Sequence, residues 1–213
     1  MKETRAQRVR AASSERRERE KQELRQAILA AAQELFFAHG YEGLSMRLVA
    51  EKIGYTPTTI YLYFEDKDDL LFAVMDQAYD RFTTDLEAAS SSTDDPLARL
   101  HNLANAYLRF ALQNQGAYQI IFMQRPDFLL KWKAGTRQPR AASLSILKQA
   151  VRQAQQAGVI NAGDVDLQSD VFWAAMHGAA ALAITMPALF GHGRLEQTLA
   201  AVLASALHSL RQA

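Results

Sequence analysis

Apolar residues recur at three- and four-residue steps along almost the whole chain, which is the spacing of one face of an α-helix. Residues 125–139, which contain Gly and Pro among basic residues, lack this spacing and are expected to be irregular or only partly helical. No alternating strand pattern and no internal repeat is present in the sequence. The predicted fold class is therefore all-α, with helices over residues 15–39, 45–53, 57–64, 68–86, 96–116, 118–124, 141–156, 166–184 and 195–210.

Residues 45–64 predict two short helices joined by a tight turn. Ser45 is a suitable N-cap for the first helix, and Gly54 is expected to end it in the left-handed conformation that other residues resist. Thr56 and Pro57 suit the N-cap and the first position of the second helix. This arrangement is typical of a helix-turn-helix, whose second helix lies in the DNA major groove. An ordinary helical hairpin inside a bundle is the alternative.

The flanking segments complete a three-helix head. Ile60 and Phe64, four residues apart, predict the buried stripe of the second helix. The long helix over 15–39 precedes the pair, and Asp66 is a suitable cap for the connecting helix that follows. Further along, Asp95 and Asp166 are expected to cap the helices that begin after them.

Three motifs occur in a fixed order within about fifty residues: ILAAA at 28–32, SMRLVA at 45–50 and TIYLYF at 59–64. In these motifs the chain resembles the tetracycline-repressor (TetR) family of bacterial transcriptional regulators. The Trp, His and Gly of residues 173–178 also resemble an element of one subgroup of TetR C-terminal domains. The Thr-Pro-Thr at 56–58 departs from the usual family pattern, so the operator sequence does not follow from the resemblance.

The resemblance implies a division into three parts. Residues 1–14 are expected to be a disordered basic arm, residues 15–67 a DNA-binding domain, and residues 68–213 a helical body that binds a ligand and dimerises. The implied function is sequence-specific regulation of transcription, most simply as a repressor that a small effector releases from a palindromic operator. Activation is the alternative sign of regulation.

Hydroxyl and basic side chains are the candidate DNA contacts. Thr and Tyr hydroxyls can bind phosphates or base edges, and Thr methyl groups can touch thymine methyl groups. The resemblance implies phosphate contacts for Tyr61 and Lys67. No Arg, Asn or Gln lies between Tyr55 and Phe64, so readout is expected to use Thr, apolar contacts, Arg47 and DNA shape. The predicted DNA-binding residues are Arg47, Thr56, Thr58, Thr59, Tyr61, Tyr63 and Lys67.

The resemblance also implies a small-molecule pocket in the body. Trp173 and His177 share a helix face, with Gly178 beside them, and His177 is a candidate polar group in an apolar pocket. Ordinary core packing is the alternative for every candidate. An aromatic lining with little charge predicts a fairly apolar effector. The candidate lining residues are Tyr79, Phe82, Tyr107, Phe110, Tyr118, Phe122, Met123, Trp173, Met176 and His177.

The last two predicted helices are candidates for a subunit interface. Residues 171–184 are rich in Ala and Gly, and residues 195–210 carry Leu along one side. Two such helices from each of two subunits could form a four-helix interface. The alternative is that the two helices pack only within one chain. Because a helix-turn-helix regulator reads two half-sites, we expect a homodimer and expect Leu203→Arg to disrupt it.

Composition narrows the alternatives. The 213-residue chain has a net charge of +1 and no Cys, so a disulfide framework and a thiolate metal site are excluded. Residues 1–25 hold nine Lys or Arg against five Glu, which suits either an arm that contacts DNA or a solvated tail. The Arg–Glu alternation from 15 to 23 also supports helical side-chain pairs.

The sequence disfavours two other function classes. An enzyme is not expected, because the sequence has no paired metal-ligand motif, phosphate-binding Gly loop or Ser nucleophile motif. A non-specific architectural DNA protein relies on broad phosphate neutralisation, which a net charge of +1 does not supply. No 18-residue apolar run and no secretory signal is present, so we expect a cytoplasmic protein without membrane span, cofactor or metal. The expected partners are operator DNA, a small effector and a second copy of the chain.

Overall fold

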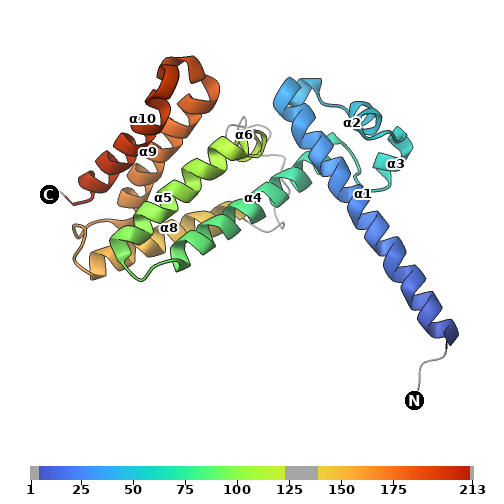
Figure 1. Ribbon diagram of the computed structural model, residues 1–213, viewed down its shortest axis with the longest axis horizontal. Helices are drawn as coiled ribbons and strands as arrows, with labels where there is room; N and C mark the ends of the chain where they lie inside the picture. The colour runs from blue at the N-terminus through green and yellow to red at the C-terminus, as the bar shows by residue number, and fades with distance from the viewer. Residues whose placement is uncertain (1–4, 123–138, 212–213) are drawn as a thin grey trace. The chain divides into compact units, whose positions relative to one another are not determined.

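The computed structural model describes residues 5–122 and 139–211, and all regular elements in these ranges are helices (Figure 1). The predicted all-α class is therefore confirmed. The chain divides into two compact units, residues 1–75 and 76–213, called here the head and the body. The division falls within helix α4 (Lys67–Ser91), whereas the sequence placed it at the start of that helix.

Helix α1 (Arg5–Gly43) is longer than predicted. It covers most of the segment that we expected to be a disordered arm, and that expectation is corrected for residues 5–14. Residues 5–14 contain three Ala and three Arg, which are good helix formers, and no Gly or Pro. Gly40, with φ of 67°, interrupts the helix where the sequence predicted its end.

Helices α2 (Met46–Ile53) and α3 (Pro57–Tyr61) form the predicted helix-turn-helix. The Ser45 hydroxyl accepts a hydrogen bond from the Leu48 N–H at 3.2 Å, and Gly54 has a φ of 75°. Both expectations are confirmed. Thr56 lies at the N-cap of α3 but makes no capping bond, and its hydroxyl instead lies 3.1 Å from that of Thr59.

Helix α3 ends three residues earlier than predicted. The Leu62 and Tyr63 N–H groups donate to carbonyls three residues back, at 3.2 and 2.9 Å, so the chain leaves α3 in a tight 3₁₀-type turn. Ile60 and Phe64 are both buried, as predicted. A helix of five residues is not stable in isolation, so packing in the head core must hold α3 in place.

The head core joins α1, α2 and α3 to the first turns of α4. Asp66 caps α4 by accepting from the Asp69 N–H at 2.8 Å, as predicted, and Asp69 in turn accepts from the Glu65 N–H at 2.9 Å. These reciprocal bonds fix the entry into α4. The largest buried side chains of the head are Ile28, Leu29, Phe36, Leu44, Ile60, Phe64, Leu70 and Leu71.

Helix α5 (Pro96–Gln113) is the central helix of the body. It packs against α6 (Gln115–Phe122), α8 (Pro139–Gln156), α9 (Val165–Thr185) and α10 (Gly191–Ser209). Asp95 caps it as predicted, accepting from the Leu97 N–H at 2.8 Å. The single helix predicted over 96–116 breaks at Asn114 instead, whose N–H still bonds to the Phe110 carbonyl at 2.8 Å. Figure 1 shows α9 and α10 running side by side.

Two further predictions about the body are corrected. Asp164, not Asp166, caps α9, accepting from the Asp166 and Leu167 N–H groups at 2.8 and 3.2 Å. A short 3₁₀ helix, η1 (Pro187–Phe190), joins α9 to α10 and was not predicted. The irregular stretch predicted at 125–139 lies outside the described residues, apart from Pro139, which begins α8.

Candidate DNA-binding surface and ligand cavity

The predicted DNA contacts differ in their exposure. Arg47 lies in the first turn of α2, Lys67 begins α4, and the other predicted residues lie in α3 or within two residues of it. Those that are exposed are Arg47, Thr56, Thr58 and Tyr61, and those that are half-buried are Thr59, Tyr63 and Lys67.

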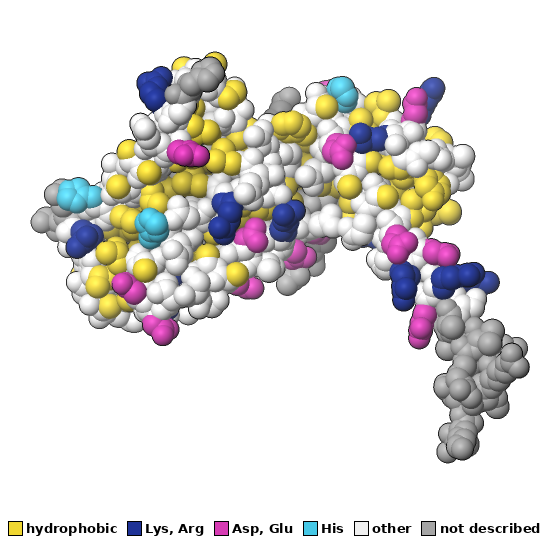
Figure 2. Space-filling view, viewed as in Figure 1, with side chains coloured by type: hydrophobic (Ala, Val, Ile, Leu, Met, Phe, Trp, Pro, Cys, Tyr) yellow, Lys and Arg dark blue, Asp and Glu magenta, His cyan; other side chains and the backbone are white. Residues whose placement is uncertain are grey.

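One exposed side chain next to α3 was not among the DNA-binding residues predicted from the sequence. Leu62 is 78% exposed and directly follows Tyr61, which is 55% exposed. Helical spacing could have predicted this exposure. Leu62 lies two residues from each of the buried residues Ile60 and Phe64, which puts it on the opposite face of a helix. Tyr55, in the turn before α3, is 49% exposed. We call Tyr55, Thr58, Tyr61 and Leu62 the reading surface, and Figure 2 shows hydrophobic side chains gathered over α3.

Lys67 is bound within the head. Its Nζ donates to the Tyr41 carbonyl at 3.0 Å and lies 3.8 Å from the centre of the Tyr41 ring. The Tyr41 hydroxyl donates to Asp68 at 2.5 Å, so these three side chains join the end of α1 to the start of α4. An ammonium group has three N–H donors, so the contact with the carbonyl leaves others for a phosphate.

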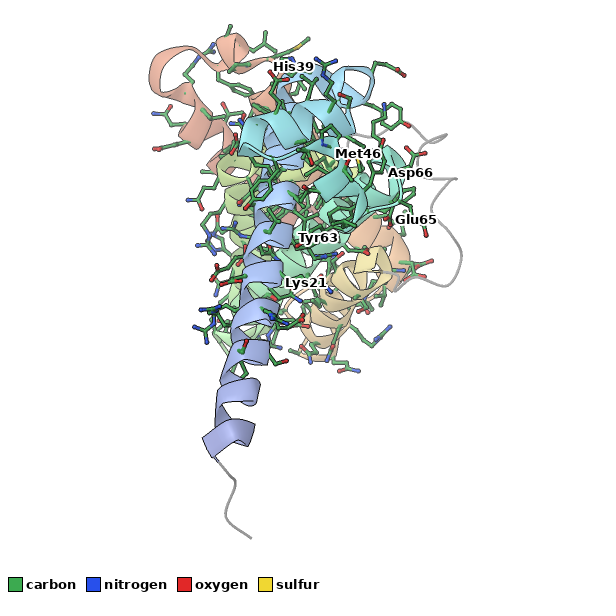
Figure 3. The ribbon with its side chains drawn as sticks, turned by 90° about the vertical axis from the view of Figure 1, so that its right-hand side faces the viewer. Lys21, His39, Met46, Tyr63, Glu65 and Asp66 are labelled. Carbon is green, nitrogen blue, oxygen red and sulfur yellow. The ribbon has the colours of Figure 1, made fainter. Side chains whose placement is uncertain are left out.

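Other cations of the head also have partners within it. Lys52 lies 2.8 Å from a carboxylate oxygen of Glu34, and the Arg25 guanidinium lies over the Phe64 ring at 5.3 Å. The acidic residues Glu65 and Asp66 follow where the chain enters α4 (Figure 3). Residues 55–64 themselves contain no charged side chain, and the exposed Arg47 lies on the neighbouring helix α2.

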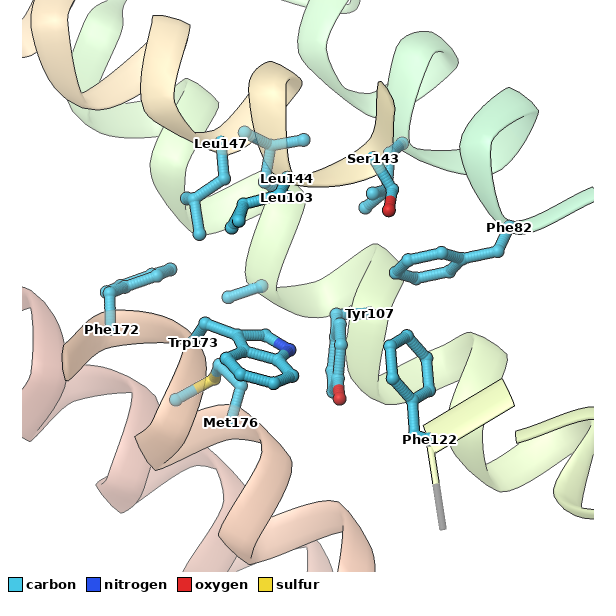
Figure 4. Close-up of a pocket in the computed structure, with 12 residues that line it drawn as sticks. Phe82, Leu103, Tyr107, Phe122, Ser143, Leu144, Leu147, Phe172, Trp173 and Met176 are labelled. Atoms are coloured by element: carbon cyan, nitrogen blue, oxygen red, sulfur yellow. The ribbon is translucent and has the colours of Figure 1, made fainter. Parts of the chain in front are cut away.

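The body contains a cavity of about 90 Å³ (Figure 4). Helices α4, α5, α6, α8 and α9 each contribute side chains to its wall. The described lining contains no charged residue, and its polar groups are a Ser hydroxyl, a Tyr hydroxyl and an indole N–H. The lining consists of Phe82, Leu86, Leu103, Ala104, Tyr107, Phe122, Ser143, Leu144, Leu147, Phe172, Trp173 and Met176.

Half of the predicted ligand residues line this cavity. They are Phe82, Tyr107, Phe122, Trp173 and Met176. Tyr79, Phe110, Tyr118 and His177 lie outside the lining, and Met123 lies outside the described residues. The buried Tyr79 instead donates its hydroxyl to the Ile121 carbonyl at 3.1 Å. Phe110 packs beside Phe82, with ring centres 4.9 Å apart.

The sequence missed the α8 side of the cavity. Leu144 and Leu147 both line the cavity from that helix. Their spacing of three residues could have predicted that they share a helix face.

Tyr107, Tyr118 and His177 form a hydrogen-bonded triangle next to the cavity. The two hydroxyl oxygens are 3.1 Å apart, and they lie 3.0 and 2.7 Å from His177 Nδ1, the Tyr118 hydroxyl being the nearer. The network joins α5, α6 and α9.

Burial suppresses ionisation of both tyrosines in the triangle. Burial raises the pKa of Tyr118 to about 12, which the hydrogen bond from Tyr107 partly opposes. The pKa of Tyr107 is raised further still, first by burial and then by its proximity to Tyr118. Both side chains are therefore neutral hydrogen-bonding groups at physiological pH.

Helices α9 and α10 also present an exposed face. Val171 and Leu182 are 49% and 45% exposed on α9. Leu203, which we expected at a subunit interface, is only 4% exposed and packs inside the chain, so Leu203→Arg is no longer a clean test of dimerisation. A groove runs between the two helices, lined by Val171, Ala175, Arg194, Gln197, Thr198, Ala201, Val202, Ser205, Ala206 and Ser209.

The described part of the chain holds neither a metal cluster nor a membrane-spanning helix. No cluster of three or more His, Cys, Asp or Glu side chains is placed to hold a metal ion there. None of the described helices combines the length and apolarity needed to cross a membrane.

Two family models match the chain. The model for the bacterial regulatory proteins of the tetR family matches residues 28–74, which cover the helix-turn-helix. The model for the tetracyclin repressor-like C-terminal domain matches residues 100–210, more than half of the chain. The two matches together include the reading surface and most of the cavity.

Named relatives match over shorter stretches. The HTH-type transcriptional activator FasR of Mycolicibacterium smegmatis is 29% identical over 100 residues, which are 47% of this chain and 46% of FasR. The HTH-type transcriptional repressor ComR of Escherichia coli is 41% identical over 64 residues, 30% of each chain. The chain thus spans less than half the length of these relatives.

A solved structure resembles most of the chain. The fatty acid degradation regulator FadR from Bacillus halodurans superposes with a TM-score of 0.75, covering 89% of this chain and 97% of that one. The sequences are 18% identical, so this likeness supports the fold alone.

The buried tyrosine pair predicts how stability changes at alkaline pH. A tyrosine in the unfolded chain ionises near pH 10. Because Tyr118 is harder to ionise in the folded protein, its contribution to the free energy of unfolding is complete below pH 10 and is lost as the pH rises toward 12. Tyr118→Phe should flatten this decline in stability, measured by urea unfolding between pH 9 and about 11.5.

Absorbance at 295 nm gives an independent reading. Of the seven tyrosines in the chain, Tyr107 and Tyr118 should stay un-ionised in the folded protein at pH 11 and titrate when it unfolds. The single variants Tyr107→Phe and Tyr118→Phe should each reduce this masked signal. Full titration of all tyrosines near pH 10 in the folded protein would contradict the burial of the triangle.

Proposed function

Because the chain belongs to the TetR family of bacterial regulatory proteins, we propose that it regulates transcription by binding a palindromic DNA operator as a homodimer. The observation that carries the proposal is the helix-turn-helix, in which buried Ile60 and Phe64 fix α3 while Tyr61 and Leu62 remain exposed. The proposed role is regulatory rather than enzymatic, and the proposed location is the bacterial cytoplasm, where operator DNA lies.

The proposed DNA contacts divide into two groups. Arg47, Tyr61 and Lys67 bind phosphates and set the position of the head on the duplex. Lys67 does so with N–H groups that the Tyr41 carbonyl does not occupy. The Thr residues of α3 approach base edges, with Thr58 the most accessible because the Thr56 and Thr59 hydroxyls lie against each other. Tyr63, which is half-buried, is a secondary backbone contact.

A homodimer is proposed because a two-fold operator needs two heads. The exposed face of α9 supplies the means, since Val171 and Leu182 present apolar surface to solvent in the single chain. Small residues lie between them on the same helix, among them Ala174 and Gly178, which are exposed. Helices with small surface residues can approach closely, so α9 and α10 are proposed to form a four-helix interface with those of a second copy.

The proposed effector is a small, fairly apolar molecule that binds the cavity. The uncharged lining favours an apolar ligand, because a charged group there would lose its hydration without a partner. At about 90 Å³ the cavity is smaller than an engineered 150 Å³ cavity that holds benzene. A larger effector must therefore bind a conformation in which the wall has moved, and it shifts the population toward that conformation.

Helix α4 is the proposed route from effector to DNA. Its first turns carry Leu70 and Leu71, which are buried in the head core, and its later turns carry Phe82 and Leu86, which line the cavity. A shift of Phe82 or Leu86 therefore moves the helix on which the head is built. An effector that favours the shifted state lowers operator affinity, and by reciprocity the operator lowers effector affinity.

Repression is the proposed sign of regulation. A dimer bound over a promoter blocks RNA polymerase without any further contact, whereas activation needs an additional surface. The named relatives include both an activator and a repressor, so activation stays the second candidate.

Single substitutions test the proposed DNA contacts. Tyr61→Phe and Arg47→Ala should each weaken operator binding about tenfold, the cost of losing a hydrogen bond to a charged phosphate. Arg47→Ala should also reduce the slope of log affinity against log salt by about one. Fluorescence anisotropy measures both quantities. Arg152→Ala, which removes an exposed Arg from α8 of the body, should change neither.

The result for Lys67→Ala should differ in kind. It removes the contact with Tyr41, so it should lower both operator affinity and the thermal stability of the protein. Unchanged affinity in the Tyr61 and Arg47 variants would contradict the assigned contacts.

The dimer is tested on the exposed residues of α9. Val171→Arg places a charge in the proposed interface without disturbing the core, because the side chain is exposed in the single chain. Light scattering should show the mass falling from twice the chain mass of 23.8 kDa to that of one chain. Ala88→Arg, an exposed position on α4, is the matched control and should stay dimeric. A monodisperse Val171→Arg dimer would remove this face from the interface.

The cavity is tested by filling it. Ethylbenzene, an apolar probe larger than the cavity, should bind the conformation in which the wall has moved. Its binding should alter the fluorescence of Trp173 in a Trp132→Phe background, which leaves one tryptophan. Benzoate, its charged counterpart, should bind at least about tenfold more weakly. Ala104→Leu extends a buried lining side chain into the space and should abolish the ethylbenzene response while retaining operator binding. An unchanged response in this variant would place the probe elsewhere.

A further inference from the structure

The helix-turn-helix exposes more apolar surface than its fold requires. Leu62 is the most exposed large hydrophobic side chain in the described part of the chain, at 78%, and Tyr55 and Tyr61 lie within eight residues of it. One exposed Leu carries no information by itself. Several exposed apolar side chains within one short motif indicate a surface that is covered in a complex.

The outward position of Leu62 is fixed by the backbone. Its N–H donates to the Thr59 carbonyl at 3.2 Å, and the Tyr63 N–H donates to the Ile60 carbonyl at 2.9 Å. The buried side chains of Ile60 and Phe64, two residues to either side, anchor this turn in the core. Leu62 is therefore presented on a rigid support and has no route into the interior.

Charged groups do not dominate this surface. The cations between residues 45 and 67 are Arg47, Lys52 and Lys67. Lys52 pairs with Glu34, and Lys67 binds the Tyr41 carbonyl. Residues 55–64 contain no charged side chain. The reading surface therefore presents hydroxyl and hydrocarbon groups to a base pair.

The major groove contains one apolar group that matches such a surface. Only thymine presents a methyl group there, at C5, whereas the other base edges present hydrogen-bond donors and acceptors. We propose that Leu62 is a specificity-determining residue that packs on thymine C5-methyl groups, so that each operator half-site has thymine at the position it covers. This inference rests on the proposed function, because it assumes that α3 enters the major groove.

Replacing thymine by deoxyuridine tests the contact, because it removes the methyl group and leaves the base pairing unchanged. The probe is a duplex enriched from a random pool by repeated binding to the wild-type protein, prepared with thymine or with deoxyuridine throughout. Fluorescence anisotropy at constant salt gives the two affinities. Wild-type protein should bind the deoxyuridine duplex about fourfold more weakly for each methyl group buried, and about fifteenfold more weakly if one is buried in each half-site.

Leu62→Ala should bind the thymine duplex about as weakly as wild-type protein binds the deoxyuridine duplex. It should also distinguish little between the two duplexes. Leu48→Ala, which truncates a 39% exposed Leu on α2, is the matched control and should keep the wild-type ratio. Any effect of deoxyuridine on DNA shape is common to all three proteins. The melting temperature of Leu62→Ala should equal that of wild type, because the side chain is exposed.

The outcomes separate this inference from the proposed function. A full thymine preference in Leu62→Ala, or none in wild-type protein, would overturn the assignment of Leu62 and leave a sequence-specific regulator. Failure of the wild-type protein to enrich any sequence would overturn the proposed function, and the inference with it. Single thymine replacements across one half-site then identify the base that Leu62 covers.

Discussion

One continuous helix, α4, contributes side chains to two separate cores. Leu70 and Leu71 are buried in the head, and Phe82 and Leu86 form part of the cavity wall in the body. A helix of 25 residues transmits a displacement along its axis because its backbone hydrogen bonds are satisfied internally. In the proposed function, this shared helix is the route by which a ligand in the body acts on DNA binding.

A second constraint acts within the head, where cations serve the structure. Lys67 bridges to Tyr41, Lys52 pairs with Glu34, and the Arg25 guanidinium lies on the Phe64 ring. These contacts hold α1, α2 and α4 around a five-residue helix that is not stable in isolation. Their consequence is a reading surface of hydroxyl and hydrocarbon groups. Under the proposed function, specific recognition depends on shape and close packing more than on charge, which favours a rigid α3.

The sequence predicted the local features well and the tertiary ones poorly. Caps and turns depend on a few adjacent residues, so Gly54 and Asp95 were identified correctly. The break between α5 and α6 was predicted at Gly116, two residues after Asn114, because Gly is the stronger signal for a helix end. The contact between Lys67 and Tyr41 joins residues 26 positions apart, and no local pattern encodes it. The α8 side of the cavity was missed for the same reason, since a lining is defined by which helices pack together.

The most direct test of the central claim is fluorescence anisotropy of the purified protein with DNA from upstream of its own gene. The measurement is made at two salt concentrations with excess competitor DNA, and the stoichiometry is determined at saturation. A dimeric, sequence-specific regulator should show saturable binding that survives the competitor, with two subunits on each site. Binding that competitor DNA abolishes on this fragment and on duplexes enriched from a random pool, or saturation with one subunit on each site, would contradict a dimeric, sequence-specific regulator.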